Sequence, residues 1–231
     1  MDLEKIFLND IEKINEWLIN IRRELHSHPE LDFNLPETVK IICTALDEMN
    51  IPYKTGIGKS GVVGEIQGKD KNITIAFRAD IDALPILEST GCSYSSKNAG
   101  RMHACGHDAH TAVLLGTAKI LSEKREELPC NVRFIFQPAE ETSGGAEPMI
   151  KDGCLENVNV IFGLHVDPMT EAGKIGIKYG AMNASSTYVD IKIKGKSCHG
   201  AYPSEGTDAV LAAAHVITAV QEKKKILLQK K

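Results

Sequence analysis

The sequence lacks a long apolar run, a secretory leader and an excess of positive charge. No segment approaches the roughly 18 consecutive apolar residues of a membrane span. Residues 1–11 mix Asp, Glu and Lys with apolar side chains instead of following a basic start with an apolar run. The net charge of −4 provides no broad basic footprint for nucleic acid. We therefore expect a cytoplasmic protein with neither a membrane nor nucleic acid as its partner.

The cysteines lack the pattern of a disulfide framework, and no Cys-x-x-Cys pair occurs. The six of them stand far apart in a chain of 231 residues, at positions 43, 92, 105, 130, 154 and 198. Dense disulfide frameworks are typical of short secreted domains. We expect most of these cysteines to be small buried side chains in a reducing compartment, with Cys105 as the exception.

Helix-like and strand-like segments alternate along most of the chain. Apolar residues at helical spacing predict helices over about residues 6–25, 36–49 and 110–122. Short apolar runs predict strands over residues 62–66, 73–77, 132–136 and 158–162. A short helix is expected after Gly144 and Gly145. This alternation predicts an α/β fold, a mixed sheet with helices on both faces.

The pattern changes near residue 182. Residues 187–194 alternate like a strand with one solvent-facing side, and a glycine-containing loop around His199 and a helix over about 206–220 follow. These elements predict the start of a smaller α+β domain. The expected division is residues 1–181 for the first domain, 182–221 for the second and 222–231 for a lysine-rich tail.

Residues of the types that bind metals occur in three loops that come after expected strands. Cys105 and His107 are two residues apart, so in an extended loop they point the same way. Glu140 and Glu141 follow one buried strand and repel each other unless they diverge or hold a cation. His165 follows another strand. Loops at the ends of parallel strands converge, and such donors suit zinc, manganese, cobalt or nickel better than calcium or magnesium.

Each signal also has a structural alternative. The Cys-x-His pair is compatible with chance, the two glutamates with solvated loop acids, and His165 with an ordinary core histidine. If a metal is bound, Glu141 would ligate it while Glu140 faces the metal-bound water as a general base. Asp82 either fixes the tautomer of a ligand histidine or caps a turn.

Taken together, the motifs resemble the N-acyl-amino-acid amidohydrolases, a branch of the aminoacylase and carboxypeptidase metalloenzymes that includes hippurate hydrolases and auxin-conjugate hydrolases. The resemblance runs from about residue 21 to residue 221. The motifs occur in the family's order and cover residues 22–31, 78–85, 102–110, 137–141 and 163–165. The resemblance implies a zinc-peptidase-like catalytic domain followed by a lid and dimerisation domain.

The resemblance also assigns roles to residues. It implies a centre of two divalent metal ions (Mn, Zn, Co or Ni) with the ligands Cys105, His107, Glu141 and His165. Glu140 would be the general base and proton shuttle, and Asp82 would support a ligand. His199 would reach the partner subunit's active site in a homodimer, unless it is a simple turn histidine. Packing or supporting roles are expected for His26, His28, His103 and His110.

The implied reaction cleaves an N-acyl amino acid to a carboxylic acid and a free amino acid. One alternative is a non-catalytic fragment that only binds metal. Another is a dipeptidase or N-acetyl-diaminopimelate deacetylase. Family members are longer and supply a further metal-binding histidine, and the similarity fades after Gln221. A frameshift or early stop would explain the lysine-rich end, and we expect such a chain to be poorly soluble and weakly active.

Overall fold

The computed structural model describes residues 3–142, 144–180, 182 and 189–228. The chain forms two compact units, Met1–Ala172 and Gly173–Lys231. The first unit contains the sheet and most of the motifs. None of the helices in the described ranges is both long enough and apolar enough to cross a membrane.

The first unit is built on a mixed five-stranded sheet with the order β1-β2-β4-β3-β5. The strands are β1 (Tyr53–Ile57), β2 (Gly61–Ile66), β3 (Asp70–Asp80), β4 (Cys130–Gln137) and β5 (Val160–Gly163). β2 is antiparallel to β1 and β4, whereas β3 runs parallel to both β4 and β5. The four predicted strands are therefore present, and β1 is an addition that the sequence pattern did not indicate.

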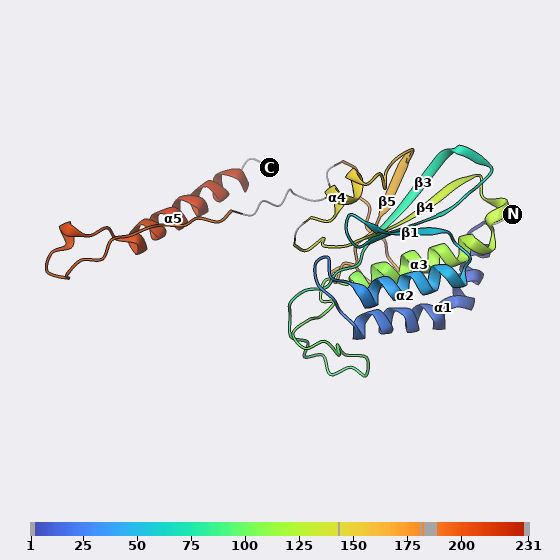
Figure 1. The fold of residues 1–231 in the computed structure, drawn as a ribbon, viewed down its shortest axis with the longest axis horizontal. Coiled ribbons are helices and arrows are strands. Elements are labelled where there is room, and N and C mark those ends of the chain that lie inside the picture. The colour runs from blue at the N-terminus through green and yellow to red at the C-terminus, as the bar shows by residue number, and fades with distance from the viewer. Residues whose placement is uncertain (1–2, 143, 181, 183–188, 229–231) are drawn as a thin grey trace. The chain divides into compact units, whose positions relative to one another are not determined.

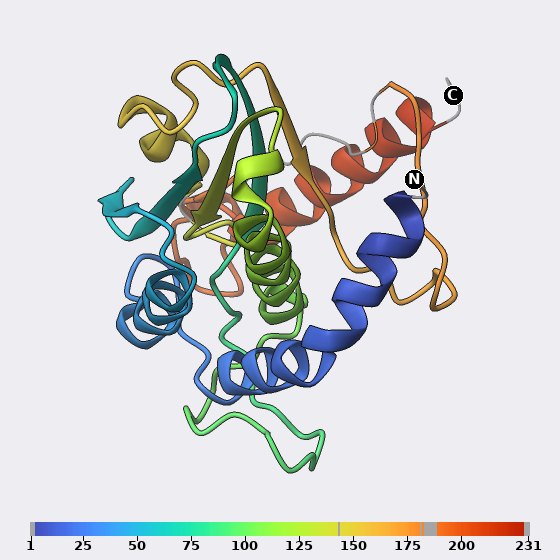
Figure 2. The same cartoon turned by 90° about the vertical axis from the view of Figure 1, so that its right-hand side faces the viewer.

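Helices cover both faces of this sheet, as predicted. Three of them, α1 (Leu3–Ser27), α2 (Pro36–Glu48) and α3 (His107–Glu123), lie on one face, and the short α4 (Ala146–Lys151) lies on the other (Figure 1). Figure 2 shows α1, α2 and α3 grouped on the same side of the strands.

The alternation of side chains along β4 explains these two layers. Phe134 and Phe136 are fully buried in the larger core cluster beneath α2 and α3, together with Leu46 and Leu115. Ile135, between them in sequence, belongs to the second cluster on the opposite face, which contains Met149 of α4. Successive residues of a strand point to opposite faces, so one apolar run supplies both cores.

The corner between α1 and α2 is held by Glu30, a buried carboxylate. Its two oxygens accept hydrogen bonds from the backbone N–H groups of Glu37 (3.2 Å) and Thr38 (2.9 Å) in the first turn of α2. These donors have no partner inside the helix, so the carboxylate caps it and also complements the helix dipole. Pro36 at the first position needs no such partner.

The second unit contains α5 (Ala209–Leu228). The helix begins about three residues later than predicted and continues through the lysines to Leu228. The predicted strand over 187–194 is wrong for its described residues, 189–194, which form no strand. A strand needs a neighbour for its backbone N–H and C=O groups, and these residues pair with none within the described ranges. The predicted division at residue 182 stays a prediction.

Candidate metal centre

The carboxyl ends of three parallel strands meet at one edge of the sheet. Asp80 at the end of β3 pairs with Gln137 at the end of β4, and Arg78 pairs with Gly163 at the end of β5. The segments that follow these strands carry Asp82, the glutamate pair and His165. The sheet register therefore brings together residues that are up to 83 positions apart, from Asp82 to His165.

The start of α3 brings in Cys105 and His107. Gly106 between them has a φ of +93°, a conformation that disfavours residues with a side chain. A Cβ at this position would lie 2.3 Å from Cγ2 of Val166. Glycine thus permits both the turn into α3 and the close approach of the chain segment that carries His165.

The four predicted ligands lie together in two overlapping groups of donors. Cys105, His107 and His165 form one group, and His107, Glu140 and Glu141 form the other, each with its donor atoms within 4.8 Å of one another. Cys105 Sγ is 3.3 Å from His165 Nε2. His107 Nε2 is 3.7 Å from Glu141 Oε1. His107 belongs to both groups.

Two of these donor atoms have a feature that fits a metal ion. His107 Nε2 and Glu141 Oε1 are buried and make no hydrogen bond within the described part of the chain. Buried polar atoms are nearly always paired, so two orphaned donors 3.7 Å apart fit a cation between them. The thiol, imidazole and carboxylate types suit zinc-like ions.

Asp82 holds two of the candidate ligands in place. His107 Nδ1 donates a hydrogen bond to the Asp82 backbone carbonyl at 2.8 Å, and the Asp82 carboxylate lies 3.4 Å from the same nitrogen. This bond leaves Nε2 of the ring to face the centre. The other oxygen of the Asp82 carboxylate accepts the backbone N–H of Glu141 at 3.1 Å.

Asp80 and His110 also belong to this region, and the sequence reasoning gave Asp80 no role. His110 Nδ1 lies 2.6 Å from Asp80 Oδ1, and the other Asp80 oxygen is 3.6 Å from His107 Nε2. His110 Nε2 accepts the backbone N–H of Val166 at 2.9 Å. The spacing of Asp80 and Asp82, two apart on one strand end, was the signal available in the sequence.

The centre concentrates negative charge. Burial, a hydrogen bond that the thiol donates to Glu141 and the charge of that glutamate raise the pKa of Cys105 to about 12. Burial and the Glu141 charge also raise the pKa of Glu140. Burial lowers the pKa of His107, but the hydrogen bond and charges of Asp82 and Asp80 outweigh it and raise the pKa overall. A bound cation would relieve all three effects.

The two glutamates differ in exposure. The Glu140 side chain is 43% exposed and that of Glu141 is 19% exposed. Ala139, just before them, is buried with a φ of +52°, which turns the chain sharply after β4. Glu141 therefore lies against the donors, while Glu140 faces solvent with one oxygen 3.9 Å from His107 Nε2.

His199 belongs to the second unit, Gly173–Lys231. Its Nδ1 accepts the backbone N–H of Ala201 at 3.2 Å, and its ring lies 5.8 Å from that of Tyr202. The side chain is exposed. Its predicted role at a partner subunit's site stays a prediction.

Known proteins are similar to this chain in sequence and in fold. Probable hydrolase sll0100 of Synechocystis is 47% identical over 89% of this chain and 52% of that protein. N-acetylcysteine deacetylase of Bacillus subtilis is 46% identical over 88% and 54%, and IAA-amino acid hydrolase ILR1-like 5 of Arabidopsis thaliana is 44% identical over 91% and 48%. The chain spans about half the length of these curated relatives.

Two solved structures share the fold. The B. subtilis YxeP protein, described as a dinuclear metal-binding peptidase of the M20 family, has a TM-score of 0.70 and 49% identity over 73% of this chain and 48% of its own. A putative aminohydrolase from methicillin-resistant Staphylococcus aureus has a TM-score of 0.78 and 36% identity over 96% and 59%. The model of peptidase family M20/M25/M40 matches residues 76–230. With two thirds of its length matched and the donor groups at the strand ends, the chain belongs to peptidase family M20/M25/M40.

Proposed function

We propose that this chain forms the metal-binding part of a dinuclear amidohydrolase that cleaves N-acyl amino acids. The observation that carries the proposal is that three three-donor groups share His107, two of which contain the four predicted ligands. Cys105, His107, Glu141 and His165 would hold two divalent ions of the Mn, Zn, Co or Ni class. The similarity to a protein that is described as a dinuclear metal-binding peptidase supports the presence of two ions.

The substrate class rests on the relatives. Their names describe a deacetylase of N-acetylcysteine and a hydrolase of IAA–amino acid conjugates. In both substrates an acyl group is joined to an amino acid. We therefore infer that an amide of this kind is cleaved here to a carboxylic acid and a free amino acid. A cytoplasmic location agrees with six free cysteines.

The residues of the centre have different roles in hydrolysis. When bound, the metal ions would supply Lewis acidity and lower the pKa of a water molecule. Glu140, exposed and with a raised pKa, takes the water proton on its carboxylate and delivers it to the nitrogen of the departing amine. Asp82 holds His107 and Glu141 in position throughout. In a homodimer, His199 of one subunit would stabilise the oxyanion at the other subunit's site.

Substitution of Glu140 tests this proposal. Glu140→Gln should keep its metal content but lose activity toward hippurate and N-acetyl amino acids by about 10²–10⁴-fold, the usual contribution of a general base. Metal content is measured by elemental analysis and turnover by release of the free amino acid. Undiminished turnover would reject the role of Glu140.

The competing functions give different results in the same assay. If the chain binds metal but shows no hydrolysis that is lost in Glu140→Gln, a non-catalytic metal-binding fragment is favoured. Faster turnover of dipeptides or N-acetyl-diaminopimelate than of other N-acyl amino acids would favour the dipeptidase or deacetylase alternative. The chemistry at the centre is the same for these substrates, so only a comparison of turnover rates across them distinguishes the two functions.

A further inference from the structure

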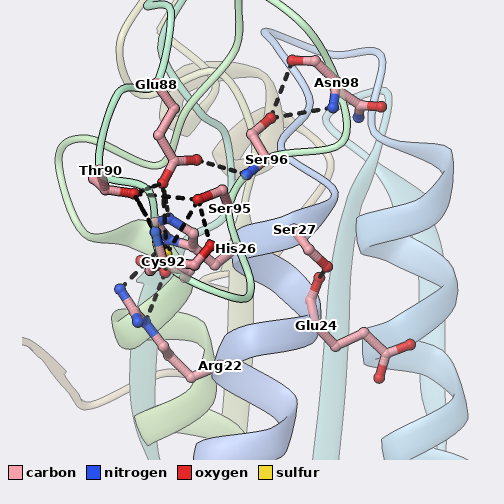
Figure 3. A network of polar contacts seen from close by, with 11 residues as sticks. Arg22, Glu24, His26, Ser27, Glu88, Thr90, Cys92, Ser95, Ser96 and Asn98 are labelled. Atoms are coloured by element: carbon pink, nitrogen blue, oxygen red, sulfur yellow. Dashed lines mark hydrogen bonds and ion pairs between the residues drawn. The ribbon is translucent and has the colours of Figure 1, made fainter.

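A second cluster of metal-binding side chains lies outside the centre described above. It forms where the long loop of residues 86–100 meets the end of α1 (Figure 3). His26 comes from α1, and Glu88 and Cys92 come from the loop. Their donor atoms lie within 4.8 Å of one another. The cluster shares no residue with the candidate centre.

The distances from the Glu88 oxygen to the other two donor atoms fit a tetrahedral ion. Zinc bonds of about 2.0–2.3 Å to nitrogen, oxygen and sulfur place a nitrogen and an oxygen ligand about 3.4 Å apart, and a sulfur and an oxygen ligand about 3.6 Å apart. The observed distance from His26 Nε2 to Glu88 Oε1 is 3.2 Å. That from Cys92 Sγ to the same oxygen is 3.8 Å. Both agree with the expected values to about 0.2 Å.

The histidine is oriented as a ligand would be. His26 Nδ1 lies 2.7 Å from the buried carboxylate of Asp108, which fixes the ring and leaves Nε2 facing the loop. Arg22 Nε contacts the same Asp108 oxygen at 2.8 Å and balances its charge. A carboxylate behind the second ring nitrogen is the usual support of a metal-binding histidine.

Hydrogen bonds within the loop stabilise the anionic forms of Glu88 and Cys92. Burial raises the pKa of Glu88, but hydrogen bonds from Thr90, from the backbone of Ser96 and from His26 outweigh it and lower that pKa to about 2. The Glu88 side chain is nevertheless only 4% exposed. Hydrogen bonds from the Ser95 and Thr90 hydroxyls lower the pKa of Cys92. A buried carboxylate beside a thiol of lowered pKa calls for positive charge at this point.

We propose that His26, Glu88 and Cys92 form a structural site for one zinc-class divalent cation. The carboxylate and the thiolate together neutralise the two charges of the ion. The Ser95 hydroxyl, 3.4 Å from Cys92 Sγ, or a water molecule completes the coordination. The ion fastens a loop without helix or strand to α1, in addition to the bonds from Lys97 N to Ser27 O (2.8 Å) and from Asn98 Nδ2 to Pro29 O (2.9 Å).

Cobalt titration of the full chain tests this site, because a thiolate bound to Co²⁺ gives charge-transfer absorption in the near ultraviolet. Cys105→Ser first removes the thiolate of the candidate centre. In this background we expect a thiolate band that appears on addition of Co²⁺ and rises to saturation as the titration proceeds. Adding Cys92→Ser should abolish the band, whereas the matched control Cys198→Ser, at an exposed cysteine, should leave it unchanged. Absence of the band, or its survival in the Cys92 variant, overturns the proposal.

A second measurement needs no substitution. Zn²⁺ should slow the alkylation of Cys92 by iodoacetamide in the unmodified chain, relative to the chain with EDTA, because the thiolate that reacts is the one that the metal holds. Alkylation of Cys198 should stay the same. Equal alkylation of Cys92 with and without Zn²⁺ also overturns the site, and the cluster is then a hydrogen-bond network alone. Because neither readout depends on hydrolysis, failure here is separate from failure of the proposed function.

Discussion

Replacing Asp82 should separate its effect on the metal centre from its effect on folding. Asp82 is buried, and its carboxylate accepts the Glu141 N–H at 3.1 Å. Asp82→Ala leaves that donor buried without a partner, which costs about 1–3 kcal/mol of stability. The substitution also frees Glu141 and removes the carboxylate 3.4 Å from His107 Nδ1, although the bond from His107 to the Asp82 backbone carbonyl remains. Loss of such support weakens metal binding by roughly 10–100-fold, or about 1.4–2.7 kcal/mol.

Two comparisons make this prediction specific. Asp82→Asn keeps an oxygen for the Glu141 N–H, so it should lose metal affinity with little loss of stability. Asp152 is a matched control away from the centre, since its carboxylate accepts the backbone N–H of Gly58 at 2.7 Å. Asp152→Ala should lower stability and leave metal affinity unchanged.

Calorimetric titration with Mn²⁺ or Zn²⁺ and urea unfolding of the metal-free chain measure the two effects. An Asp82→Ala chain with wild-type metal affinity would refute the reasoning. So would an Asp152→Ala chain that loses as much affinity as the Asp82 variant, because the effect would then be a general consequence of lower stability.

Two further predictions concern the turn into α3. The pKa of Cys105 is about 12 without metal, so an ion must displace its proton at neutral pH. Apparent metal affinity should therefore rise with pH. Cys105→Ser should reduce the slope of log affinity against pH by about one proton for the ion that Cys105 binds, in titrations between pH 6 and 8. An unchanged slope would show that the thiol is not a ligand. Gly106→Ala should lower stability by about 1–2 kcal/mol in urea unfolding because of its φ of +93°. Adding Val166→Ala should relieve the contact with the new Cβ but not this conformational cost, so full rescue would contradict the argument.

The sequence predicted those parts of the fold that depend on local patterns. The apolar run of β4 and the helical spacing of α2 identify their elements because each buries a regular set of side chains. β1 escaped prediction because three of its five residues are exposed, which removes the apolar signal. The strand expected over 187–194 is the opposite case, in which the sequence pattern alternates but the described residues form no strand. Alternation alone does not supply a neighbouring strand to pair with.

The candidate site was predictable where the donors are close in sequence or follow strong strands, as for Cys105, His107 and His165. Asp80 was missed because its contact with His110, 30 residues later, depends on how α3 packs against β3. The cluster of His26, Glu88 and Cys92 is similar, since His26 and Glu88 are 62 positions apart and come together only through the path of an irregular loop. Such contacts are set by tertiary packing, which periodicity does not record.

The corner at Glu30 limits where this protein can be modified. Its side chain caps α2, and its backbone carbonyl accepts the N–H of Ala83 at 2.8 Å, directly after Asp82. A peptide tag or a spectroscopic label inserted between Pro29 and Pro36 would thus shift the strand end on which the candidate ligands depend, although the segment is a short connection of the kind that usually tolerates insertion.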